Sequence, residues 1–128
     1  MSLLSMLSLG KSKPKTMIKQ ISVTDAHELV LAGRTTLIDV RKLAEWNETG
    51  RPQGSHGVTL QDEDFFEKVL KIMGGDKTQP IAFTCRTGGR SSEAAERAKA
   101  VGHTDISNVE GGFLAWSAAK LPVDQGPF

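Results

Sequence analysis

The chain has 128 residues and a mass of 13.8 kDa, the size of one domain that folds without disulfides or a structural metal. Its 16 Lys and Arg residues against 15 Asp and Glu residues give a net charge of +1, which lacks the basic excess typical of nucleic-acid-binding proteins. One cysteine and three scattered histidines exclude an intramolecular disulfide framework and a zinc-finger spacing, and no apolar run has the length of a membrane-spanning helix.

The first fifteen residues differ from the rest in composition. Residues 1–9 are apolar and rich in serine, and Lys11, Lys13 and Lys15 follow them. A secretory signal carries its positive charge before the apolar run, so this order argues against one. The leucines allow a weak amphipathic contact with a membrane or partner, but termini are commonly disordered and we favour a flexible tail. We expect an N-terminal tail at 1–15, one domain at 16–124 and a C-terminal tail at 125–128, in a cytoplasmic protein with no firm membrane association.

From residue 16 onward, segments with strand character alternate with segments of helical periodicity. Strands are predicted at 17–21, 36–40, 58–60, 80–84 and 106–109. The first helix is predicted to begin at Thr24 as its N-cap and to end near Gly33, and further helices are predicted at 43–48, 62–73, 91–101 and 113–120. Such alternation is typical of parallel sheets covered by helices. We therefore expect an α/β fold with a central five-stranded parallel sheet and helices on both faces.

The segment with the clearest chemical character follows the strand at 80–84. It reads Cys85-Arg86-Thr87-Gly88-Gly89-Arg90-Ser91 and precedes an alanine-rich helix. The paired glycines allow a tight turn in which successive N–H groups point into one concavity, and Ser91 is a suitable cap for the helix. Ligands of parallel sheets bind beyond the carboxyl ends of the strands, which is where this segment begins.

These features would stabilise an anion, and the nearest anion is the thiolate of Cys85. Cysteines beside helix N-termini and arginines have pKa values of about 3.5–7.5, against about 8.5 for a free thiol. A lone cysteine is more commonly an inert core residue. The combination of strand end, paired glycines, Arg86, Arg90 and helix start instead favours a reactive nucleophile.

Three stretches of the sequence resemble one known family, the rhodanese-like sulfurtransferases. They are Leu37-Ile38-Asp39-Val40-Arg41 with Glu45-Trp46 after it, the loop 85–91, and Val109-Glu110-Gly111-Gly112-Phe113-Leu114-Ala115-Trp116. Their order and spacing are similar to those of a single rhodanese-like domain over residues 16–124. One departure is the segment 50–57, where family members often carry a Gly-His-Ile-Pro-Gly-Ala-like sequence. The entry to the third strand and its contribution to the rim of the site stay open.

The resemblance implies a thiosulfate sulfurtransferase-type enzyme that works by a two-step exchange. The Cys85 thiolate attacks the outer sulfur of a donor such as thiosulfate, and the resulting persulfide passes its sulfur to cyanide, a thiol or a sulfur-carrier protein. A pre-formed thiolate needs no general base for either step. No cofactor or metal is implied. The expected partners are small sulfur donors and acceptors and a sulfur-carrier or thioredoxin-like protein, with no nucleic acid.

Within the loop, Arg86 and Arg90 are candidates for binding the sulfonate of the donor. The other loop residues would cradle the persulfide, and these are Thr87, Gly88, Gly89 and Ser91.

Other residues near the predicted site have structural interpretations. Asp39 and Arg41 follow a buried strand, and we expect them to support the site as an ion pair or turn. Trp46 and Trp116 have apolar neighbours at helical spacing and are expected in the core. The glycines at 111 and 112 indicate a tight turn into the last helix. No histidine is expected to pair with Cys85, although His56 lies in the variable loop and is the one that could reach the rim.

Two other functions remain open on the sequence alone. Cysteine-dependent phosphatases and arsenate reductases also wrap an oxyanion in backbone amides, but their loops place an arginine six residues after the cysteine. Here the sixth residue is Ser91 and Arg90 is the fifth. The remaining possibility is a sulfur-relay or docking module that acts only with a protein partner. The sequence does not identify the physiological donor or acceptor.

Overall fold

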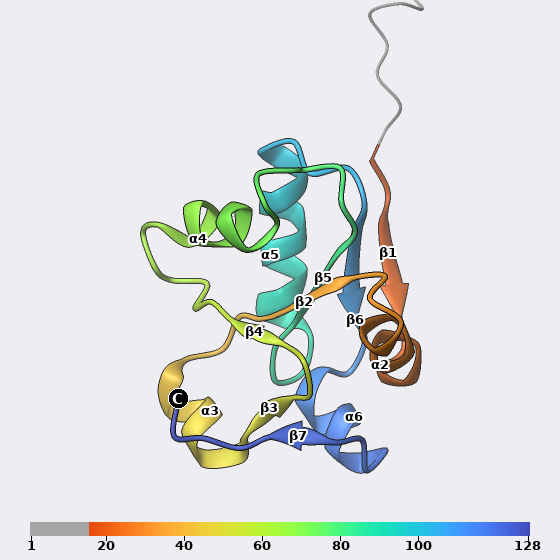
Figure 1. The fold of residues 1–128 in the computed structure, drawn as a ribbon, viewed down its shortest axis with the longest axis vertical. Coiled ribbons are helices and arrows are strands. Elements are labelled where there is room, and N and C mark those ends of the chain that lie inside the picture. The colour runs from red at the N-terminus through yellow and green to blue at the C-terminus, as the bar shows by residue number, and fades with distance from the viewer. Residues whose placement is uncertain (1–15) are drawn as a thin grey trace, which may run out of the picture.

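The computed structural model describes residues 16–128 as an α/β fold around one parallel sheet (Figure 1). The five strands lie in the order β1-β6-β5-β2-β4, and every neighbouring pair is parallel. Their bounds are β1 Ile18–Ile21, β2 Thr36–Asp39, β4 His56–Gly57, β5 Ile81–Thr84 and β6 Ile106–Val109. The helices are α2 Val23–Leu31, α3 Leu43–Thr49, α4 Phe65–Ile72, α5 Gly89–Ala100 and α6 Gly112–Ala118. The predicted fold class is confirmed.

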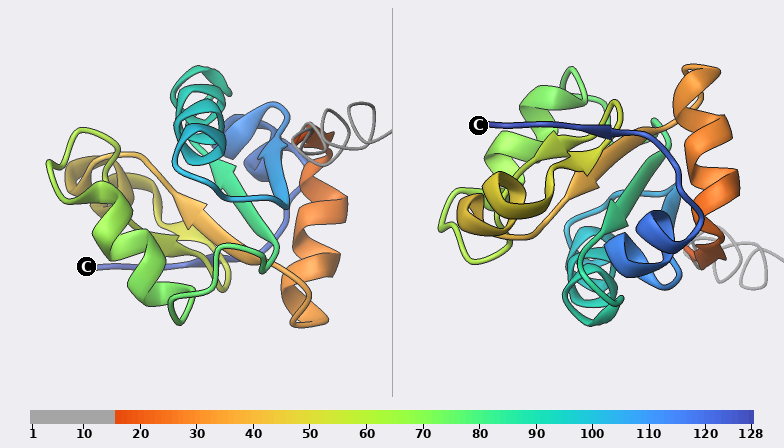
Figure 2. Two further views of the ribbon diagram at one scale, coloured as in Figure 1. Left: turned by 90° about the horizontal axis from the view of Figure 1, so that it is seen from above. Right: turned by 90° about the horizontal axis from the view of Figure 1, so that it is seen from below.

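Two apolar cores lie on opposite faces of the sheet, because successive strand residues point to opposite sides. On one face, Ile81 and Phe83 of β5 pack with residues of α4 and the alanines of α5. On the other face, Ala82 packs with α2 and α6, including the buried Trp116. The figures show the helices distributed around the sheet in the same way (Figures 1 and 2). β5 is therefore covered on both sides, and its carboxyl end leads into the loop that precedes α5.

Three predicted boundaries are wrong in detail. The N-cap of α2 is Ser22, not Thr24, because the Ser22 side chain accepts a hydrogen bond of 3.0 Å from the N–H of Asp25. The strand expected at 58–60 is β4, two residues earlier. After β4, the N–H groups of Val58 and Leu60 still donate to the carbonyls of Asp39 and Val40, at the end of β2. α4 begins at Phe65 instead of near residue 62, since tight turns occupy the intervening residues.

The C-terminal segment packs along the edge of the domain. β7, Val123–Asp124, pairs antiparallel with β3, Arg51–Pro52, and neither short strand was predicted. The ring of Phe128 packs edge-on against Trp46 with centroids 6.4 Å apart, and its N–H donates to Asn47 at 2.8 Å. The C-terminus therefore lies beside α3 (Figures 1 and 2). The tail predicted at 125–128 is held against the domain, and the tail predicted at 1–15 lies outside the described residues.

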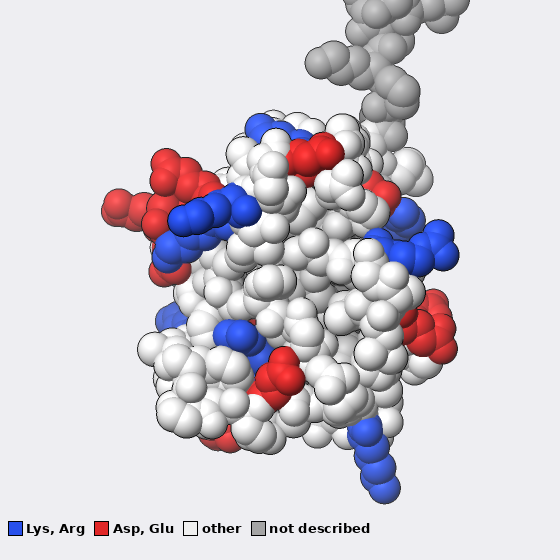
Figure 3. Space-filling model, viewed as in Figure 1, with Lys and Arg blue, Asp and Glu red and all other residues white. Residues whose placement is uncertain are grey.

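On the face seen in Figure 3 the charged side chains lie in small separate groups. Acidic and basic side chains lie apart from one another or side by side, and no patch of one sign covers the face. Among residues 16–128, no helix combines the length and the apolar character needed to cross a membrane.

Candidate active site

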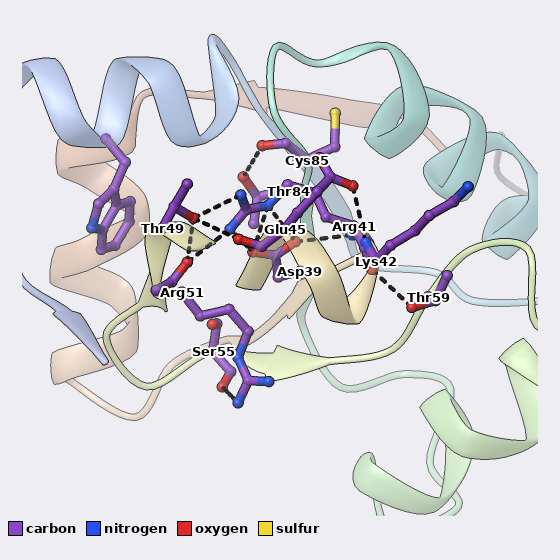
Figure 4. Close-up of polar contacts among 12 residues, drawn as sticks. Asp39, Arg41, Lys42, Glu45, Thr49, Arg51, Ser55, Thr59, Thr84 and Cys85 are labelled. Atoms are coloured by element: carbon purple, nitrogen blue, oxygen red, sulfur yellow. Dashed lines mark hydrogen bonds and ion pairs between the residues drawn. The ribbon is translucent and has the colours of Figure 1, made fainter. Parts of the chain in front are cut away.

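Cys85 lies directly after β5, at the carboxyl edge of the sheet. It shares a face with Ile81 and Phe83, so its side chain belongs to the side covered by α4 and α5, and only 1% of the residue is exposed. Figure 4 shows its sulfur pointing away from Asp39 and Arg41, which lie behind it. The thiol is therefore enclosed by the loop that follows it.

That loop directs hydrogen-bond donors at the sulfur. The N–H of Gly88 donates to the Cys85 Sγ at 3.0 Å, and the Ser91 hydroxyl lies 3.3 Å from the same atom. Gly88 has φ +124°, a conformation that other residues rarely adopt. Gly89 has an ordinary φ and begins α5, with Gly88 as the N-cap. Ser91 thus lies inside the helix, and the expectation that it caps α5 is wrong.

The back of the loop is held by the first turn of α6. The N–H groups of Phe113 and Leu114 donate to the carbonyls of Cys85 and Arg86, at 2.8 and 3.1 Å. This close approach requires Gly112, where a Cβ would lie 2.5 Å from the Cys85 carbonyl oxygen. The turn predicted at residues 111 and 112 is therefore present. By binding the carbonyls of Cys85 and Arg86, α6 also fixes the orientation of these two peptide groups in the loop after β5. Sequence reasoning missed this role because it depends on contacts between distant segments.

The environment of Cys85 favours the thiolate over the thiol. Burial alone would raise the pKa of Cys85, but hydrogen bonds from Ser91, Gly88 and Thr87 outweigh it and lower the pKa below its ordinary value. No histidine among residues 16–128 forms a hydrogen bond with the thiol. His27 packs edge-on against Trp116, His103 is buried near Phe66, and His56 lies exposed on β4.

Arg90 does not point freely into the site. Its guanidinium forms two hydrogen bonds with the carboxylate of Glu45 on α3, at 2.7 and 2.9 Å. The pair is about 30% exposed, and the bonds from Arg90 lower the pKa of Glu45 to about 2 despite partial burial. Sequence reasoning used Glu45 only for the family resemblance. Its partner lies 45 residues away in the chain, and no local pattern indicates the pair.

Asp39 and Arg41 form a buried ion pair beneath the loop. The Arg41 guanidinium donates to the Asp39 carboxylate at 2.8–3.1 Å (Figure 4) and to the Gly50 carbonyl at 3.0 Å. It also stacks over Phe113, 4.4 Å from the ring centroid. Neither side chain is more than 1% exposed. The pair joins the end of β2 to the end of α3 and to α6. These contacts are compatible with the supporting role that the sequence predicts, which stays a prediction.

Arg86 is the exposed arginine of the loop. It lines a groove of about 450 Å³ between α3 and α6, whose lining also includes Glu45, Glu48, Phe113, Leu114 and Ser117. Within residues 16–128 it forms no ion pair. No group of three or more His, Cys, Asp and Glu side chains in that range is placed to hold a metal ion. The site as described consists of one cysteine, backbone donors and charged side chains.

Residues 22–119 match the family described as the rhodanese-like domain. Thiosulfate sulfurtransferase 16, chloroplastic, from Arabidopsis thaliana is 33% identical over 111 residues, which cover 80% of this chain and 89% of that protein. A rhodanese-related protein of Thermoplasma volcanium superposes with a TM-score of 0.68 at 27% identity, covering 82% of this chain and 96% of that one.

The polysulfide-sulfur transferase homodimer of Wolinella succinogenes is similar to the chain in the same way. It superposes with a TM-score of 0.69 at 28% identity, and the match covers 85% of this chain and 80% of the Wolinella chain. The match of the family over residues 22–119, the parallel sheet and the loop around Cys85 agree with one another. The chain therefore belongs to the rhodanese-like sulfurtransferase family.

Proposed function

We propose that the protein transfers a sulfane sulfur from thiosulfate or a persulfide donor to a thiophilic acceptor through a persulfide on Cys85. The observation that carries the proposal is the N–H of Gly88 at 3.0 Å from the Cys85 sulfur, in a loop that lowers the pKa of the thiol. The thiolate is the nucleophile that attack on sulfur requires, and the lowered pKa increases the fraction of Cys85 that is ionised.

In the first step the Cys85 thiolate attacks the outer sulfur of thiosulfate. A bond forms between the two sulfur atoms, the bond between the outer sulfur and the sulfonate breaks, and sulfite leaves with the electron pair. The loop amides stabilise the negative charge on the terminal sulfur of the persulfide. Arg86, exposed beside the loop, attracts the sulfonate.

In the second step an acceptor removes the terminal sulfur. Cyanide, a thiol or a sulfur-carrier protein attacks it, the bond between the two sulfurs breaks, and the electron pair returns to Cys85 as the thiolate. Neither step needs a proton from a neighbouring acid or a cofactor. The names of the relatives support the reaction class, since one is a thiosulfate sulfurtransferase and another a polysulfide-sulfur transferase.

The geometry of the loop argues against phosphate chemistry. A phosphatase of this type needs an arginine six residues after the nucleophile to bind the phosphoryl oxygens, and Ser91 occupies that position here. Its buried hydroxyl lies 3.3 Å from the Cys85 sulfur and 3.2 Å from the Gly88 carbonyl oxygen, and it donates to the sulfur when Cys85 is a thiolate. Arg90 is paired with Glu45. These contacts leave no arginine in the position that binds phosphoryl oxygens in such phosphatases.

Intact mass measurement after incubation with thiosulfate tests the proposal directly. The protein should gain the mass of one sulfur atom and lose it again when cyanide is added, with thiocyanate as the product. Cys85→Ser should gain no sulfur, because an alcohol in that position neither attacks sulfur nor holds a persulfide. Thiocyanate formation that persists in Cys85→Ser above a protein-free blank would refute Cys85 as the nucleophile. A protein that takes sulfur only from another protein would instead be a relay module.

A further inference from the structure

The two arginines of the loop lie in different electrostatic environments. Arg86 is exposed and forms no ion pair within the described residues 16–128. Arg90 forms two charge-assisted hydrogen bonds with Glu45, and the side chains of this pair are 30% and 27% exposed. The sequence therefore presents two positive charges beside Cys85, but the fold leaves one of them unneutralised.

The position of Glu45 is fixed from both sides. One oxygen of its carboxylate accepts a hydrogen bond of 3.1 Å from the N–H of Lys42, at the start of α3, and the same carboxylate holds Arg90. The pKa of Glu45 is about 2, so the carboxylate stays ionised at any pH at which the enzyme would be assayed. Arg90 lies in the first turn of α5, and the N-cap of this helix, Gly88, donates to the Cys85 sulfur, so Arg90 is beside the same site. The negative charge of Cys85 is one of the causes that raise the pKa of Arg90.

We propose that Glu45 is a specificity-determining residue that withdraws Arg90 from the substrate and so lowers the affinity of the site for small dianionic sulfur donors. This inference rests on the proposed function and narrows its substrate class. With Arg90 neutralised, thiosulfate gains an attraction from Arg86 alone and also meets the carboxylate of Glu45. An organic persulfide without a sulfonate carries at most one negative charge on its sulfur atoms, so it loses less by the same arrangement. The site is therefore tuned towards persulfide donors and away from thiosulfate.

The chain offers a matched control on the same helix. Glu48 follows Glu45 by three residues and lines the groove between α3 and α6 with it, but it has no bond to Arg90. Glu45→Gln and Glu48→Gln therefore each remove one negative charge from the same side of the groove. Only the first releases an arginine. The glutamine introduced by Glu45→Gln keeps an oxygen that can accept the N–H of Lys42, so the start of α3 is preserved.

The experiment compares KM and kcat for thiosulfate and for an organic persulfide donor that carries no sulfonate. Glu45→Gln should lower the KM for thiosulfate about fivefold to tenfold, the scale of one added charge-assisted contact at a partly exposed site. Its KM for the organic persulfide should change less than about twofold. Glu48→Gln should leave the KM for thiosulfate within about twofold. In Glu45→Gln/Arg90→Ala the gain should disappear, because the arginine that caused it is absent.

A direct binding measurement accompanies the kinetics. Sulfite does not transfer sulfur to a free thiol but is itself alkylated by iodoacetamide, so its protection of Cys85, corrected for the iodoacetamide that it consumes in a protein-free blank, reports anion binding. Glu45→Gln should be protected at about fivefold to tenfold lower sulfite concentrations than the wild type. Equal effects of Glu45→Gln and Glu48→Gln, or a gain that survives Arg90→Ala, would overturn the inference. Failure of the wild type to take sulfur from either donor would instead refute the proposed function, while the sulfite measurement still tests the role of Glu45.

Discussion

Replacement of Gly112 by alanine is the sharpest test of how the loop is held. The residue has φ +56°, and a Cβ there would lie 2.5 Å from the carbonyl oxygen of Cys85 and 2.6 Å from that of Arg86. Both obstacles are backbone atoms of the loop, so no side-chain rotation relieves them. α6 must move away from the loop, and the hydrogen bonds from Phe113 and Leu114 to these carbonyls lengthen or break.

The expected loss of stability has two parts. A left-handed backbone costs alanine about 1–2 kcal/mol, and forcing a methyl group into a packed site costs about 1–3 kcal/mol. Gly112→Ala should therefore lower the free energy of unfolding by about 2–5 kcal/mol. Gly74 provides a matched control, since it has φ +68° but a Cβ there would meet nothing within 4 Å. Gly74→Ala should cost only the first part, about 1–2 kcal/mol.

Two assays separate the stability effect from the effect on the thiol. Urea unfolding of both variants gives the free energies, and the pH dependence of iodoacetamide alkylation gives the pKa of Cys85. That pKa should rise in Gly112→Ala, because the loop amides no longer face the sulfur in a fixed direction, and it should be unchanged in Gly74→Ala. If the two variants lose the same stability and share one alkylation midpoint, the close approach of α6 to the loop does not orient the amides.

The remaining predictions concern the loop itself and one distant histidine. Gly88→Ala should lose about 1–3 kcal/mol of stability and most of its sulfur transfer, because φ +124° strains an alanine. Gly89→Ala should lose neither, because Gly89 has an ordinary φ and a Cβ there would meet nothing within 4 Å. Equal melting temperatures of the two variants would contradict this prediction. Arg86→Ala should raise the KM for thiosulfate about tenfold, as expected when a charge-assisted contact is lost, and an unchanged KM would place the donor elsewhere. Burial lowers the pKa of His103 in the folded protein below the ordinary value of 6.5, so His103 binds a proton more readily in the unfolded protein. The free energy of unfolding should therefore fall as the pH drops from 6.5 towards the lowered pKa. Urea unfolding at about pH 7.5 and about pH 5.5, on either side of that range, measures this fall, and it should shrink in His103→Gln; an equal fall in that variant would assign it to other groups.

The parts of the fold that were predictable are those in which local pattern and burial agree. β2, β5 and β6 are buried on both faces of the sheet, and the apolar runs of β2 and β5 stand out against the polar loops. With the helical segments between them, they give the correct order of strands and helices. β4 was misplaced because its two residues, His56 and Gly57, carry no apolar signal and are a strand only through pairing with β2. β3 and β7 are likewise defined by their pairing.

The candidate site shows the same division. Cys85 and its loop could be identified because the glycines, the arginines and the helix start are adjacent in sequence. The support from Glu45 and from α6 could not, since these contacts join segments that are far apart along the chain. The prediction that Arg90 binds the sulfonate remains untested, and its pairing with Glu45 is the reason to test it separately from Arg86.

The contact between α6 and the loop also has an electronic consequence. Each carbonyl that accepts an N–H from α6 belongs to the same peptide group as the N–H of the next residue, so the bonds to Cys85 and Arg86 polarise the amides of Arg86 and Thr87. Hydrogen bonds in series strengthen one another, and a polarised amide is a better donor to the sulfur. α6 contributes no side chain to the thiolate in this arrangement. It stabilises the negative charge through the peptide group between Arg86 and Thr87, because the N–H of Thr87 is among the donors that lower the pKa of Cys85.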